Sequence, residues 1–122
     1  LLFVGDVHGS QGDTEFYGVA DETRGEVTLS CNVIKKKRIP FLRLEKEESI
    51  VSLYCDRPLE DAVRIAVVNL IDWLIDEHGY TQKEAYITVC VNPDFRVNVY
   101  QMVKLGRLLY TVGAELPKKY LS

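Results

Sequence analysis

The sequence predicts an α+β domain. Three features of the chain predict this class: strand-like alternation of apolar and polar residues within residues 1–57, a helical period of apolar residues within 58–91, and a return to alternation within 92–122. A chain of 122 residues is long enough for one domain with a buried core. We therefore expect residues 1–122 to form a single domain with a β-rich part, a helix pair and closing strands.

The β-rich part begins with strands separated by polar turns. The apolar run at residues 1–4 predicts a strand, and residues 16–20 can form a second one before a turn at 21–25. Residues 26–33 alternate strictly between apolar and polar side chains, which predicts a half-buried strand with one wet face. The apolar side of this strand consists of Val27, Leu29, Cys31 and Val33.

A hairpin is expected next. Pro40 ends the preceding segment, and two short apolar runs follow at 41–45 and 50–55. The residues between them, 46–49, are polar and rich in glutamate, as is typical of a tight connection between antiparallel strands.

A helix pair follows the hairpin. Between Pro58 and Gly79 the apolar residues recur at three- and four-residue steps, which predicts a long helix with a broad apolar face. Proline near the first turn and glycine after the last turn are typical helix boundaries. Thr81 and Glu84 have the spacing of a capping box, so a second, shorter helix is expected through about Val89.

The closing segment returns to strands. The break at 92–94 precedes a strand over 95–100, Gly106 marks a turn, and 108–116 is expected to be the last strand. Pro117 is expected to end regular structure.

Charge and hydropathy exclude several classes of function. The net charge of −3 gives no reason to expect a nucleic-acid partner. The basic run at 35–38 is followed by three glutamates, so its field largely cancels and a solvated turn or strand end is expected. No apolar segment approaches the roughly 20 residues needed to cross a bilayer, so no membrane partner is expected.

The three cysteines point to a reducing compartment. Cys31, Cys55 and Cys90 are odd in number, lack CxxC spacing and lie in apolar periodic segments, so we expect small buried side chains and a cytoplasmic protein.

The segment from Gly5 to Glu15 is the candidate chemical site. Asp6 and His8 are separated by one residue, so on an extended backbone their side chains point the same way and can meet one cation. Glu15 can approach them after the glycines bend the chain, and a carboxylate there can act as a general base. Mixed nitrogen and oxygen ligands suit zinc better than calcium. The alternative is that Asp6 and Asp13 cap turns and His8 is a solvated loop residue.

The other candidate residues are assigned by position. Glu22 is either a turn carboxylate or a residue facing the same cleft as the loop. His78 falls in the last turn of the long helix, where the helix dipole favours a cation, so a structural role is expected. Trp73 has helical core spacing.

One resemblance is to the calcineurin-like metallophosphoesterases. Residues 2–9 look like their opening strand and D-x-H-G turn. That family needs two further metal-binding blocks, G-D-x-x-D and G-N-H-[DE]. Gly12-Asp13 comes too early for the first block, and no histidine lies between His8 and His78, so we reject this family as the main interpretation.

A second resemblance, to the acetamidase/formamidase family, runs the length of the chain. The family signature G-D-x-H-x-x-Q-G-D-G-E is matched by residues 5–13 and by Glu15, with Thr14 in place of the last glycine. Residues 22–33, the helix carrying Asp72-Trp73-Leu74, and the ending 114–119 are also similar to that family. The resemblance implies a mainly antiparallel, sandwich-like sheet with the inserted helix pair.

The resemblance also implies an activity and residue roles. It implies a metal-dependent hydrolase of short amides such as formamide or acetamide, with zinc or calcium as the cofactor. Asp6 and His8 would hold the metal, Glu15 would transfer protons, and Asp13 would orient the loop. Gln11 and Glu22 would contact the substrate.

The resemblance implies an incomplete site. Members of the family are much longer, so this sequence would be a C-terminal portion carrying one wall of the pocket. Its partners would be a small amide substrate and either further copies of the chain or a missing N-terminal portion. A non-catalytic assembly domain of the same fold is the alternative, with Thr14 reflecting lost catalysis.

Overall fold

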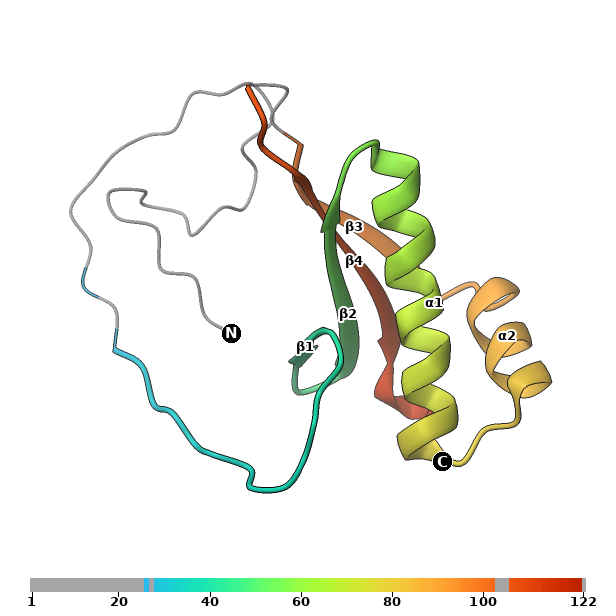
Figure 1. Cartoon of the computed structure of the whole chain (residues 1–122). Coiled ribbons are helices and arrows are strands. Elements are labelled where there is room, and N and C mark those ends of the chain that lie inside the picture. The colour runs from blue at the N-terminus through green and yellow to red at the C-terminus, as the bar shows by residue number, and fades with distance from the viewer. Residues whose placement is uncertain (1–25, 27, 103–105, 122) are drawn as a thin grey trace.

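The computed structural model describes residues 26, 28–102 and 106–121, which form an α+β fold as predicted (Figure 1). The elements follow one another in the order strand, strand, helix, helix, strand, strand, with a short closing turn of 3₁₀ helix. The strands predicted at 1–4 and 16–20 and the turn predicted at 21–25 lie outside the described residues.

A four-stranded antiparallel sheet has the order β1-β2-β4-β3. The predicted hairpin is confirmed, since β1 (Leu42–Glu45) pairs with β2 (Ser49–Asp56). β2 also pairs along its whole length with β4 (Tyr110–Pro117), and β4 pairs with β3 (Arg96–Gln101). The first and last thirds of the described chain are therefore joined through the two central strands.

Both helices lie on one side of this sheet. α1 (Leu59–His78) packs against β2 and β4, and α2 (Gln82–Cys90) lies on the side of α1 away from the sheet (Figure 1). The hydrophobic core lies between these layers. Its fully buried members are Ile50, Ala62, Ala66, Leu70, Trp73, Leu74, Ala85, Val89, Val112, Ala114 and Leu116.

The helix boundaries agree with the local signals. Pro58 is the N-cap of α1, and Gly79 ends it in the left-handed conformation at φ 72° while its N–H donates to the carbonyl of Leu74. Thr81 and Glu84 form the predicted capping box: the Thr81 side chain accepts from the Glu84 N–H, and the Glu84 carboxylate accepts from the Thr81 N–H.

The face of the sheet away from α1 contains a close approach at Gly113. Val112 and Ala114 point into the core beside α1, so alternation places Gly113 on the opposite face. A Cβ built there would lie 2.6 Å from Tyr100 Cε2 and 2.7 Å from Val51 Cγ1. Glycine is therefore required by space at this position, since those two side chains occupy the volume of a methyl group.

The strand predicted over 26–33 is wrong for the part of it that the structure describes. Residue 26 and residues 28–33 have no strand assignment, and Leu29 and Val33 are exposed. A strand needs a neighbouring strand to accept and donate its backbone hydrogen bonds, and its apolar face needs a surface to cover. The described residues provide neither for this segment.

Two smaller predictions also need correction. Cys31 and Cys90 are exposed and Cys55 is half-buried, all as free thiols, so the expectation of buried cysteines is wrong. Cys31 lies in the unpaired segment, and Cys90 follows the buried Val89 on a face of α2 turned away from the core. Pro117 ends β4, but a 3₁₀ helix, Lys118–Tyr120, continues regular structure beyond it.

None of the helices in the described ranges is long and apolar enough to cross a membrane.

Candidate functional site

The predicted metal loop and its neighbours precede the described part of the chain. The six candidate site residues all precede residue 26, so they lie outside the described ranges. They are Asp6, His8, Gln11, Asp13, Glu15 and Glu22. Within the part of the chain that the structure describes, no group of three or more histidine, cysteine or carboxylate side chains could hold a metal ion. We call the described residues the scaffold.

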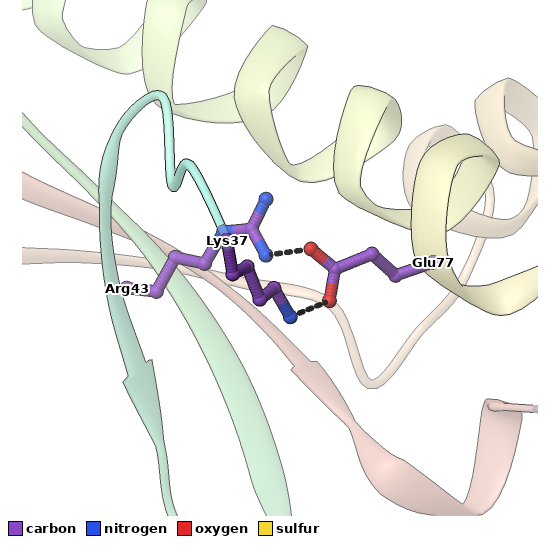
Figure 2. Close-up of polar contacts among 3 residues, drawn as sticks. All are labelled: Lys37, Arg43 and Glu77. Carbon is purple, nitrogen blue, oxygen red and sulfur yellow. Dashed lines mark hydrogen bonds and ion pairs between the residues drawn. The ribbon is translucent and has the colours of Figure 1, made fainter. Parts of the chain in front are cut away.

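The first polar cluster of this scaffold surrounds Glu77, near the C-terminal end of α1 (Figure 2). Lys37 Nζ donates to Glu77 Oε2 at 2.8 Å, and an Arg43 guanidinium nitrogen donates to Glu77 Oε1 at 2.5 Å. The hydrogen bond from Lys37, followed by that from Arg43, lowers the pKa of Glu77 to about 2. Glu77 therefore joins α1 to Lys37, which precedes β1, and to Arg43, which lies within β1.

Aromatic side chains strengthen the link at Arg43. Its guanidinium lies 4.5 Å from the ring centroid of Phe41 and 4.3 Å from that of Trp73, and its side chain is only 9% exposed. The ring centroids of Phe41 and Trp73 are 6.3 Å apart in an edge-on arrangement. The chain entering β1 is thus fixed to α1 by charge and by packing.

A second cluster surrounds Glu115 on the opposite face of the sheet. Its Oε1 accepts from the Ser49 hydroxyl at 2.5 Å and from Lys46 Nζ at 3.1 Å, and its Oε2 accepts from Asn98 Nδ2 at 2.5 Å. Burial alone would raise the pKa of Glu115, but the hydrogen bonds from Ser49, Lys46 and Asn98 outweigh it and hold the pKa below its ordinary value. The hydrogen bond to Glu115 raises the pKa of Lys46 in turn.

The sequence analysis did not single out this cluster. Ser49, Asn98 and Glu115 come from three strands and meet only through the register, in which Ser49 opposes Pro117 and Asn98 opposes Gly113. The available signal is a lone carboxylate in the otherwise apolar and small run 112–116, which indicates a polar site on that face. The cluster joins three strands with one carboxylate.

The Acetamidase/Formamidase family matches residues 1–118, which include the candidate loop and every element of the described fold except the last turn of 3₁₀ helix. The chain belongs to the Acetamidase/Formamidase family. Family membership confirms the resemblance inferred from the signature and removes the phosphoesterase alternative.

A solved structure supports the family at the level of the fold. The chain is similar to the crystal structure of an acetamidase from Yersinia enterocolitica, with 39% sequence identity and a TM-score of 0.64. The match covers 73% of this chain and 26% of that acetamidase, so the chain spans about a quarter of the length of this relative. No curated protein matches the chain.

Further polar contacts of this family member join its C-terminal end to Tyr80, between the two helices, and to Asp94, which follows α2. The Tyr80 hydroxyl donates to the backbone carbonyl of Tyr120, whose own hydroxyl donates to Asp94 at 2.6 Å. Lys119, then Tyr120, lowers the pKa of Asp94 by donating to it. His78 lies in the last turn of α1 with its ring centroid 6.3 Å from that of Trp73, which agrees with the structural role expected for it.

The helix pair also bounds a shallow, open depression of about 380 Å³ lined by Gly79, Tyr80, Glu84, Ile87 and Thr88. Its one carboxylate, Glu84, already accepts from Thr81 in the capping box. The one carboxylate of this depression is therefore engaged in the cap of α2.

Proposed function

We propose that the chain carries one wall of the active site of an amidase that hydrolyses short amides of the formamide and acetamide type to ammonia and a carboxylic acid. The observation that carries this proposal is the family match over residues 1–118, because it includes the loop at 5–15 as well as the scaffold. The 39% identity to the Yersinia acetamidase supports the same class of substrate.

The proposed cofactor is a divalent metal, most simply zinc, with calcium as the alternative. The donor set of Asp6 and His8 joins an imidazole to a carboxylate, which fits a borderline divalent ion. When bound, such an ion supplies a Lewis acid and lowers the pKa of water toward neutrality.

The other candidate site residues transfer the proton and bind the substrate. Glu15 accepts the proton of the attacking water and returns it to the departing ammonia. Asp13 orients the loop, while Gln11 and Glu22 hold the amide group of the substrate through hydrogen bonds. The side chains of this chain thereby position water and substrate on one side of the pocket.

The opposite wall belongs to residues outside this chain. Because the chain spans about a quarter of the acetamidase it matches, we expect little activity from the 122 residues alone. The proposed partners are a small amide substrate and either further copies of the chain or an N-terminal portion, with no nucleic acid and no membrane. Its three free cysteines support placing it in the cytoplasm.

A pair of histidine variants tests the site in the complete gene product. His8→Ala should remove the bound metal, measured by elemental analysis, and should lower ammonia release from formamide and acetamide at least about a hundredfold. His78→Ala is the matched control, since His78 lies on α1, and it should keep its metal. Unchanged metal content and activity in His8→Ala would refute the site assignment.

The alternative is a non-catalytic assembly domain of the same family. The observation that favours it is Thr14, which adds a Cβ beside Glu15 where the signature has glycine. An ammonia-release assay of the complete protein against a panel of small amides separates the two functions. No turnover together with no bound metal would favour the assembly domain.

A further inference from the structure

We draw no further inference here: the strongest candidate, the side-chain cluster around Glu115 on the face of the sheet away from α1, joins three strands through hydrogen bonds that occupy both oxygens of its carboxylate, and nothing in the described part of the chain points to a ligand there.

Discussion

Residues 26–33 and β2 have a comparable share of apolar residues, but only β2 is a paired strand with buried side chains. Within β2, Ile50 and Val51 are completely buried, one against the helices and the other on the opposite face beside Tyr100 and Gly113. Residues 28–33 alternate more regularly than β2, yet they remain exposed and unpaired. The difference teaches that alternation gives a segment the capacity to be a strand, while a neighbouring backbone decides whether it becomes one.

The largest loss of stability is expected from a substitution in the hydrophobic core. Trp73→Ala removes a side chain that is 1% exposed and contacts Arg43 and Phe41, so it should lower the free energy of unfolding by about 3–5 kcal/mol. Urea unfolding measures this loss. Val68→Ala on the exposed side of the same helix should cost less than about 0.5 kcal/mol. Equal losses in the two variants would mean that the helix face is assigned incorrectly.

Glycine is required for different reasons at two positions. Gly113 has no room for a side chain, whereas Gly79 adopts a positive φ. Gly113→Ala should destabilise the protein by about 1–3 kcal/mol, because the new methyl group meets Tyr100 and Val51. Gly79→Ala meets nothing within 4 Å, but its φ of 72° should cost about 1 kcal/mol. Adding Tyr100→Ala should recover part of the loss at Gly113 and none at Gly79. Urea unfolding of the single and double variants provides the comparison, and recovery at both positions would contradict it.

Loss of the Glu77 carboxylate, which is bonded to Lys37 and Arg43, should lower the stability by a smaller, pH-dependent amount. Its pKa is about 2 in the folded protein against an ordinary 4.5, so the stabilisation is present above pH 4.5 and is lost as the pH falls toward 2. Glu77→Gln should cost about 0.5–1 kcal/mol at pH 7, since the cluster is partly exposed, and little at pH 2.

Unfolding at several pH values tests this difference, and Glu47→Gln in the exposed β1–β2 turn is the control. A pH-independent cost at Glu77 would show that packing, rather than charge, makes its contribution.

The smallest effect is expected in the exposed segment. Val33→Ala should change the stability of the isolated chain by less than about 0.5 kcal/mol, whereas Val112→Ala in the core should cost at least about 1 kcal/mol. The same atoms are removed in both variants, so urea unfolding compares the two environments directly. A substantial loss at Val33 would mean that its side chain is already packed in this chain.

Local signals account for most of what could be predicted about the fold. Pro58, Gly79 and the Thr81–Glu84 pair set the helix boundaries through contacts within a few residues, so the sequence displays them. The segment over 26–33 was predicted wrongly because its outcome depends on a partner that alternation does not identify.

The polar sites also include features that are visible in the sequence and features that depend on long-range contacts. The spacing of Asp6 and His8, which predicts a pair of metal ligands, is visible in the sequence because only one residue separates them. The cluster at Glu115 was missed because Ser49 and Asn98 reach it only through strand register, a long-range property. The opposite wall that we propose for the pocket would come from residues outside this sequence, so the sequence does not predict it.

The stacking of Arg43 on Trp73 has a practical consequence for spectroscopy. Trp73 is the sole tryptophan in the sequence, and its ring centroid lies 4.3 Å from the guanidinium carbon of Arg43, a residue of β1. If β1 moves relative to α1, the surroundings of this indole change even though α1 stays folded. Emission intensity at a single wavelength can thus follow the attachment of residues 37–43 to α1 in real time, without a label.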